Sequence, residues 1–459
     1  MRKYFGTDGI RRIANTELTP ELVYKVAKAG AYVLSKHTDH APTIFIGRDT
    51  RISGTLIESA MTAGFLSYGA NVKMLGVMPT PAVAYLTKKF KADASVVISA
   101  SHNTFEFNGV KYFSNKGMKI PDELEEEIEE VMDSGKINEL TAVNDKIGTS
   151  EIATELLDEY VYFFRKNFEE DLERLNRDDF VVAVDTANGA TSVVADKVFT
   201  VLGIKHHILN DSPNGININD GCGSTHLEML KQYVIDKKCS LGIAYDGDGD
   251  RCLAVDENGN EIDGDKIIAI ISQYLKSKGK LNKDTIVATV MSNLGLNKYA
   301  KQNELNFVQT KVGDRYVLEE MLKNGYNLGG EQSGHVICLD YNPTGDGILT
   351  SLMIIRAILE QGKKASEVAS IMKAYPQVLI NAKVSSDKKY DFDKDEEIKS
   401  AIEKLNKEFD GNGRVLIRAS GTEPLVRVMI EGEDQDYIKQ KAQTIANLIE
   451  QKLGDGEKK

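Results

Sequence analysis

Three aspartates alternate with glycine directly after an apolar run. Asp246, Asp248 and Asp250 lie in the string SLGIAYDGDGDRC. Carboxylates this close repel one another unless they share a cation, and oxygen-only ligands favour Mg²⁺ over zinc. An EF-hand is excluded, because its sixth position requires glycine and is Arg251 here, and because a strand-like run precedes the loop. The remaining alternative is a solvated acidic turn.

A hydroxyl that could carry a phosphoryl group lies in VVISASHNTFEFNGVKYF. Ser101 ends the apolar run, His102 follows it, and Lys111 comes ten positions later. A serine at the end of a strand is placed to act as a nucleophile. Ser99 is chemically equivalent, and a Ser-His pair is often no more than turn chemistry. The metal loop favours the catalytic interpretation, because an ion bound there needs a phosphoryl group to act on.

Two further strings offer groups for a sugar phosphate. GGEQSGH presents Glu331 and Ser333 for sugar hydroxyls and His335 for proton transfer, although a polar loop between domains is an equal alternative. RVLIRASGTEPLVRV combines guanidinium groups, hydroxyls and successive backbone N–H groups into a predicted phosphate-binding loop, with an ordinary hairpin as the alternative. The binding residues of that loop are Arg418, Ser420, Gly421, Thr422 and Arg427.

Two lesser features carry isolated cations. In GTDGIRR, Arg11 could reach a phosphate, and in QTKVGDRYV, Lys311 precedes a predicted helix. A surface ion pair is the plainer interpretation of each.

These loops are positioned by alternating strand and helix patterns. Period-two runs such as TIFIGRD and ASVVISA alternate with amphipathic stretches, which predicts α/β units with mixed sheets. The pattern restarts three times, and the last part is smaller, with a strand, a helix, two strands and a closing helix. We therefore predict four domains, at residues 1–150, 151–256, 257–372 and 373–459.

Composition excludes several classes of protein. The 459 residues are 41% hydrophobic and 27% charged, with a net charge of -12 and no basic stripe, which argues against nucleic-acid binding. Four cysteines without a C-x-x-C pair argue against a disulfide framework or a structural zinc site. Neither a signal peptide nor an apolar stretch of membrane-spanning length is evident, so we expect a cytoplasmic protein without membrane partners.

The four loops together resemble the α-D-phosphohexomutase superfamily, whose pattern is a serine loop, D-G-D-G-D-R, G-E-x-S-G-H and R-x-S-G-T-E-P. The resemblance implies three similar α/β domains and a smaller C-terminal α+β domain around a central cleft. It also implies that Ser101 is a phosphoserine whose phosphate, with Asp246, Asp248 and Asp250, holds one Mg²⁺ per subunit. The sugar would be read by Glu331 and Ser333. The phosphate that is not reacting would be bound by Arg418, Ser420, Gly421, Thr422 and Arg427.

The resemblance also implies the reaction. The phosphoserine would donate its phosphoryl group to a sugar monophosphate, giving a transient 1,6-bisphosphate whose other phosphate returns to Ser101. Arg251, Lys111 and Lys311 would supply positive charge, and either Lys111 or His335 would move the proton. A hexose 1,6-bisphosphate or another phosphoryl donor would prime the serine, and a homodimer is implied.

Gln332, with strings such as KYFGTDGIR and GRDTRISG, is similar to the branch that interconverts glucosamine 6-phosphate and glucosamine 1-phosphate for UDP-N-acetylglucosamine and cell-wall precursors. Three alternatives remain. One is a phosphomannomutase or phosphoglucomutase with the same mechanism. The others are a metal-dependent phosphatase and a non-catalytic protein that binds divalent ions.

Overall fold

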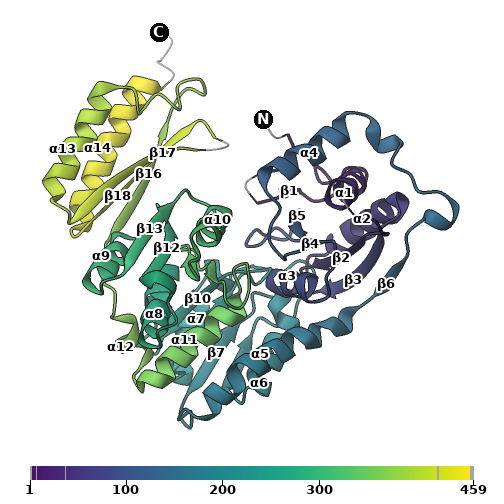
Figure 1. Ribbon diagram of the computed structural model, residues 1–459. Helices are drawn as coiled ribbons and strands as arrows, with labels where there is room; N and C mark the ends of the chain where they lie inside the picture. The colour runs from purple at the N-terminus through teal and green to yellow at the C-terminus, as the bar shows by residue number, and fades with distance from the viewer. Residues whose placement is uncertain (1–2, 7, 37, 421–422, 455–459) are drawn as a thin grey trace. The chain divides into compact units, whose positions relative to one another are not determined.

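The computed structural model describes residues 3–6, 8–36, 38–420 and 423–454. The chain divides into two compact units, one of Met1–Met291 with Glu304–Ile371 and the other of Ser292–Asn303 with Met372–Lys459. Three mixed sheets lie in the first unit and one antiparallel sheet in the second (Figure 1). The predicted fold class, three α/β sheets and a smaller C-terminal α+β domain, is confirmed. Among the described residues, no helix is both long and apolar enough to cross a bilayer.

The first sheet has the strand order β1-β5-β4-β2-β3-β6. Its middle strands are parallel, whereas β5 runs antiparallel to β4 with Val97 opposite Lys111. The connection between β4 and β5, residues 99–106, contains Ser101. Helix α1 begins where Thr19 Oγ1 accepts the Leu22 N–H at 3.3 Å. The elements of this part are β1 (Ile10–Ile13), α1 (Pro20–Ser35), β2 (Thr43–Arg48), α2 (Gly54–Tyr68), β3 (Asn71–Val77), α3 (Thr80–Lys89), β4 (Ala94–Ile98), β5 (Phe107–Ser114), α4 (Asp122–Asp133) and β6 (Ser150–Ile152).

The second sheet has the order β11-β10-β9-β7-β8. Strands β9 and β10 are antiparallel, with Tyr245 opposite Cys252, so residues 246–251 form the tight connection between two buried strands. This connection is the string with the three aspartates. The elements are α5 (Leu157–Glu173), β7 (Val181–Asp185), α6 (Ala195–Val201), β8 (Lys205–Leu209), α7 (Glu228–Lys237), β9 (Leu241–Tyr245), β10 (Cys252–Asp256) and β11 (Glu261–Ile262).

The third sheet has the order β13-β12-β14-β15. Strands β14 and β15 are antiparallel, with Gly330 opposite Val336, so residues 331–335 connect them. Gly334 has φ +93°, and a Cβ there would come within 2.4 Å of the Cys252 carbonyl oxygen, which requires glycine. The elements are α8 (Gly264–Ser277), β12 (Thr285–Thr289), β13 (Asn306–Thr310), α10 (Asp314–Asn324), β14 (Leu328–Gly330), β15 (Val336–Cys338), α11 (Gly347–Gln361) and α12 (Ala365–Ala369).

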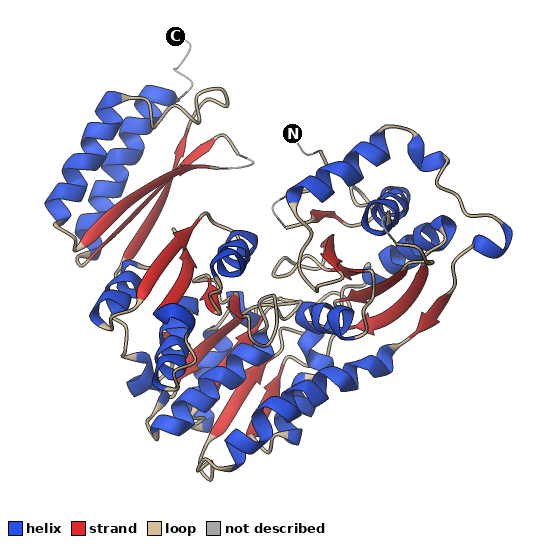
Figure 2. Cartoon of the chain, in the orientation of Figure 1, coloured by secondary structure: helices blue, strands red, loops and turns tan. Residues whose placement is uncertain are grey.

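The second unit is an antiparallel sheet in the order β16-β18-β17, with α13 and α14 against one face (Figure 2). Helix α9 belongs to this unit although it precedes the rest in sequence. The Asn293 side chain before it accepts the Tyr375 N–H and donates to the Tyr375 carbonyl, both at 2.9 Å. The elements are α9 (Leu294–Gln302), β16 (Gln377–Lys383), α13 (Glu396–Phe409), β17 (Gly413–Ala419), β18 (Leu425–Gly432) and α14 (Gln435–Leu453).

Candidate active site

The structure brings the serine and the aspartate loop into direct contact. Ser101 Oγ donates to Asp246 Oδ2 at 2.6 Å, and Ser101 is 1% exposed. One ligand oxygen from each of Asp246, Asp248 and Asp250 lies within 4.8 Å of the others. A hydroxyl and three buried carboxylates therefore face one point, although the serine string and the aspartate string are far apart in sequence.

The aspartate loop fits a divalent cation. Asp248 Oδ1 and Asp250 Oδ1 are buried and have no hydrogen-bond partner among the described residues. Burial first, and then the charges of Asp250 and Asp248, raise the pKa of Asp246 well above its usual range. Buried carboxylate oxygens without partners are costly unless an ion or a proton satisfies them. Mg²⁺ suits this all-oxygen set.

The serine loop is held by two side chains that the sequence did not single out. Arg51 is 1% exposed and donates through Nη2 to the carbonyls of Ser101, at 3.0 Å, and Asn103, at 2.8 Å. Asn219 Nδ2 donates to the same two carbonyls, each at 2.9 Å. Asp49 completes the arrangement by accepting from Arg51 Nε at 2.9 Å. The loop conformation, with φ of 51° at Ser101, is therefore fixed from two sides.

Two cations lie at the aspartate loop. Lys111 Nζ lies 2.9 Å from Asp248 Oδ2, and the Arg251 N–H donates to Asp246 Oδ1 at 3.1 Å. Burial lowers the pKa of Lys111, but the charges of Asp248, Asp8 and Asp250 outweigh it and raise the pKa overall. The contact of Arg251 is made by its uncharged backbone N–H; burial lowers the pKa of its guanidinium, but the charges of Asp246 and Asp250 raise it overall. That the two side chains supply positive charge to the reaction stays a prediction.

The two predicted histidines differ in basicity. His102 Nδ1 lies 3.4 Å from Ser101 Oγ, and burial together with the charges of Arg251 and Arg11 lowers the pKa of His102 to about 4. His335 is buried, and its Nδ1 lies 3.6 Å from Asp250 Oδ2. Burial lowers the pKa of His335, but nearby carboxylates, Asp250 foremost, raise it overall. His102 is therefore neutral at pH 7, and His335 is the more basic of the pair.

The other residues predicted in the first unit lie less centrally. Glu331 Oε1 accepts the Gly313 N–H at 3.0 Å, which anchors the loop of residues 331–335 to the start of α10. Ser333 and Lys311 are exposed, and Lys311 Nζ lies 5.9 Å from the centroid of the Tyr316 ring. Arg11 pairs with Asp8. Of these four side chains, Ser333 and Lys311 are the two that are exposed, whereas Glu331 and Arg11 have partners within the protein.

The predicted phosphate-binding loop lies in the second unit. Arg418 and Arg427 are directly opposite each other on β17 and β18, and the Nε of each is buried without a hydrogen-bond partner among the described residues. Burial, and then the charge of Arg427, lowers the pKa of Arg418. Two like charges in register destabilise a sheet unless an anion lies between them. Ser420 is described and buried, whereas Gly421 and Thr422 lie outside the described residues.

Four family models match the chain in order. They describe phosphoglucomutase/phosphomannomutase α/β/α domain I over residues 2–139, domain II over 158–259, domain III over 263–375 and the C-terminal domain over 379–448.

Similar proteins and structures agree with these matches. Phosphoglucosamine mutases of Ruminiclostridium cellulolyticum and Clostridium botulinum are 52% and 54% identical, each over 99% of this chain and 100% of the relative. A solved phosphoglucomutase/phosphomannomutase family protein from Burkholderia thailandensis has a TM-score of 0.80 at 20% identity, over 98% of this chain and 97% of that one. The N-acetylphosphoglucosamine mutase of Aspergillus fumigatus, solved with GlcNAc-6P and magnesium, has a TM-score of 0.68 at 18% identity, over 98% and 96%. These two structures share the fold.

Proposed function

Because this chain belongs to the phosphoglucosamine mutases, within the phosphoglucomutase/phosphomannomutase family, we propose that it interconverts glucosamine 6-phosphate and glucosamine 1-phosphate through a phosphorylated Ser101. It is thus an isomerase. The observation that carries the proposal is the 2.6 Å contact between Ser101 Oγ and Asp246 in the buried aspartate loop. The contact supports the proposal, because a cation held by the aspartate loop would lie beside this hydroxyl and could neutralise the charge of a phosphoryl group carried there.

The first step transfers the phosphoryl group from Ser101 Oγ to the free hydroxyl of the sugar monophosphate. The hydroxyl loses its proton to a base, and Ser101 Oγ is released as the leaving oxygen and regains a proton. Lys111 and His335 are the two candidates for the proton transfer, because both contact the aspartate loop. The 1,6-bisphosphate then presents its other phosphate, which returns to Ser101 by the reverse chemistry.

Asp246, Asp248 and Asp250 would hold one Mg²⁺ together with the Ser101 phosphate. When bound, the ion would neutralise charge on the transferring group. Thr80, the first residue of α3, supports this loop, since its Oγ1 donates to Asp248 Oδ2 at 2.7 Å. Arg251 adds a second positive charge beside Asp246.

Binding of the substrate is assigned to the other predicted residues. Glu331 and Ser333 would read the sugar hydroxyls, with Lys311 and Arg11 as additional cations. Arg418 and Arg427, with Ser420, Gly421 and Thr422, would bind the phosphate that is not reacting. The positions of Arg418 and Arg427, directly opposite each other on β17 and β18, support this assignment, because the buried Nε of each lacks a hydrogen-bond partner among the described residues. The nearest carboxylate to Arg427 is Glu423, whose Oε2 lies 3.6 Å from Nη2.

The test is a mutase assay of the purified protein, primed with a hexose 1,6-bisphosphate in Mg²⁺, on glucosamine, glucose and mannose 6-phosphates. We expect the amino sugar to give the highest kcat/KM. A preference for a neutral hexose would keep the mechanism and support a phosphomannomutase or phosphoglucomutase. Release of inorganic phosphate without isomer would instead indicate a phosphatase.

Replacing Ser101 by Ala removes the only atom proposed to carry the phosphoryl group. We expect Ser101→Ala to lose turnover while its circular dichroism spectrum and unfolding midpoint stay close to those of wild type. Ser59→Ala is the control, because Ser59 is exposed and its Oγ donates to the Thr55 carbonyl within α2, whereas Ser99 Oγ accepts the Ser101 N–H at 2.9 Å and helps to hold the serine loop. Full activity in Ser101→Ala would overturn the mechanism.

Three further expectations stay proposals: the cytoplasm as the site of action, a homodimer, and domain boundaries near residues 150, 256 and 372. The four cysteines are all buried and free. Light scattering after size-exclusion chromatography tests the dimer, and limited proteolysis tests the boundaries.

A further inference from the structure

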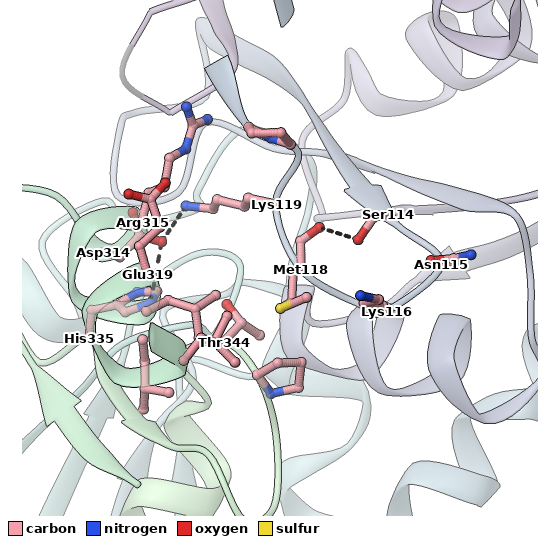
Figure 3. Close-up of a pocket in the computed structure, with 15 residues that line it drawn as sticks. Ser114, Asn115, Lys116, Met118, Lys119, Asp314, Arg315, Glu319, His335 and Thr344 are labelled. Carbon is pink, nitrogen blue, oxygen red and sulfur yellow. Dashed lines mark hydrogen bonds and ion pairs between the residues drawn. The ribbon is translucent and has the colours of Figure 1, made fainter. Parts of the chain in front are cut away.

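A lysine that the proposed reaction does not use bridges two carboxylates beside the aspartate loop. Lys119 Nζ lies 2.5 Å from Asp8 Oδ1 and 2.6 Å from Asp314 Oδ2. Figure 3 shows Lys119 and Asp314 pointing toward each other on one side of a cavity of about 300 Å³, with His335 beside them. Lys119 is 11% exposed, so the contacts are largely shielded from water.

Each bridged carboxylate also contacts one of the two candidates for proton transfer. The second oxygen of Asp8 lies 3.2 Å from Lys111 Nζ, and Asp314 Oδ2 lies 3.5 Å from His335 Nε2. Lys111 Nζ and His335 Nδ1 lie 3.8 Å and 3.6 Å from the same atom, Asp250 Oδ2. The contacts therefore close into a ring in which acidic and basic groups alternate: Asp250, Lys111, Asp8, Lys119, Asp314 and His335.

The ring joins three parts of the chain that are distant in sequence. Asp8 and both lysines come from the first sheet and its connections, Asp250 from the β9–β10 connection, and Asp314 and His335 from the third sheet and α10. Lys119 is anchored to the strand of Lys111, because it pairs with Phe113 in a β-bridge. A single ammonium group thus lies between elements that carry different parts of the site.

We propose that Lys119 is a positioning residue for the mutase reaction: through Asp8 and Asp314 it holds the Lys111 amine and the His335 imidazole at the aspartate loop. This inference rests on the proposed function. It assigns to Lys119, Asp8 and Asp314 a role that neither the motifs nor the family matches give them.

The physical reason is the arrangement of charge around Lys119. Without the Lys119 ammonium group, the carboxylates of Asp8 and Asp314 would repel each other, and little water would be present to screen the repulsion. Each carboxylate would turn toward water or toward its remaining cation. Lys111 would keep its contact to Asp248, and His335 Nε2 would keep the Gly345 N–H that it accepts at 3.0 Å. Each would lose its contact to Asp8 or Asp314, and with it part of what orients it at the aspartate loop. The requirement is for positive charge at this position, so arginine should serve better than an apolar side chain of similar length.

The first experiment compares Lys119→Met and Lys119→Arg with wild type in the primed mutase assay. Groups that orient others in a site change activity by roughly 10- to 100-fold when replaced, and we expect a loss of kcat in that range for Lys119→Met with little change in KM. Lys119→Arg should recover most of the loss. Lys116→Met is the matched control, because Lys116 is an exposed lysine in the same turn and lines the same cavity.

A double variant tests whether Lys119 acts through Asp314. If it does, Lys119→Met with Asp314→Asn should cost no more than the larger single loss, since side chains in one network are not additive. Losses that multiply would overturn the shared role. A raised KM at unchanged kcat would also overturn it, because Lys119 would then bind substrate directly. The inference would also be overturned if Lys119→Met lost kcat together with a lower unfolding midpoint and Lys119→Arg did not recover the activity.

The last measurement does not depend on turnover. In protein labelled with ¹⁵N at histidine, the ring nitrogen signals of His335, assigned with His335→Gln, should shift in Lys119→Met and stay in place in Lys116→Met. Unchanged His335 signals would overturn the inference even in an active enzyme. An inactive wild type with shifted signals would instead leave the ring standing and overturn the proposed function.

Discussion

Ser101 adopts a backbone conformation that serine rarely takes, with φ of 51°. Hydrogen bonds from Arg51 and Asn219 to the carbonyls of Ser101 and Asn103 hold it there. Strain of this kind persists only where surrounding groups over-determine it, and it is frequent at reacting centres. The hydroxyl of Ser101 is consequently preorganised beside Asp246, because the loop is held in one conformation.

Arg51→Met tests this arrangement. The change removes the donor to the loop and leaves Asp49 buried without its cation, and breaking a buried pair in this way costs about 3–5 kcal/mol. We expect a loss of that size in the free energy of unfolding, measured in urea, together with a fall in kcat. Arg174→Met, which removes an exposed arginine paired with Glu170, should change neither. Wild-type stability in Arg51→Met would show that the loop holds its shape by other means.

At the scale of elements, each predicted loop is a connection between antiparallel strands or follows a strand directly. Residues 246–251 join β9 to β10, residues 331–335 join β14 to β15, and the predicted phosphate-binding loop joins β17 to β18. Such strings are contiguous, so their residue types and order were sufficient to predict them. The predicted strands and helices around them are confirmed for the same reason, since their periodicity is local.

The groups that hold these loops could not be predicted in that way. Asn219 lies 118 residues from Ser101, and only the fold brings the two together. Lys119 and Asp314 are single charged residues in a chain that is 27% charged, so their types carried no information. Arg51 and Asp314 do occur in GRDTRISG and KVGDRYV, strings that pointed to the family without showing what these side chains contact.

Helix α11 begins at Asp346, a buried carboxylate whose ionisation should make the stability of the fold depend on pH. Asp346 accepts the Leu349 N–H at 2.9 Å and the Tyr160 hydroxyl at 2.8 Å, and burial raises its pKa to about 6. In the unfolded chain the value is about 3.9, so the folded state binds more protons between these values. The contribution of Asp346 to stability therefore falls as pH rises from about 4 to 6.

The measurement is the free energy of unfolding of wild type and of Asp346→Asn at a series of pH values. The difference between them should move in favour of the variant across this window, by on the order of 2 to 3 kcal/mol. It should be flat above about pH 7, where the carboxyl is ionised in both states. A constant difference at all pH values would mean that Asp346 has an ordinary pKa. Asp171→Asn, in a half-exposed carboxylate that pairs with Arg356, is the control.

At the scale of the whole molecule, the division into two units predicts how Mg²⁺ acts on stability. The three aspartates proposed to hold the metal and Ser101 all belong to the first unit, and a ligand stabilises only the cooperative region that binds it. Calorimetry should show that Mg²⁺ raises the unfolding temperature of the first unit and leaves that of the second unit in place. At 100 times the dissociation constant the gain is about 2.7 kcal/mol. Asp248→Asn should abolish the shift, and equal shifts of all transitions would contradict the division.

The hydrogen bond from Ser101 to Asp246 has a consequence for any batch of this protein. If Ser101 carries the phosphoryl group as proposed, its hydroxyl keeps a hydrogen-bond partner at 2.6 Å when the phosphate is absent, so the unphosphorylated form leaves no buried hydroxyl unpaired. On the proposed mechanism, a preparation would be a mixture of phosphorylated and unphosphorylated molecules, and its specific activity would depend on their ratio as well as on the rate constants. Intact mass spectrometry read alongside the assay would separate the two.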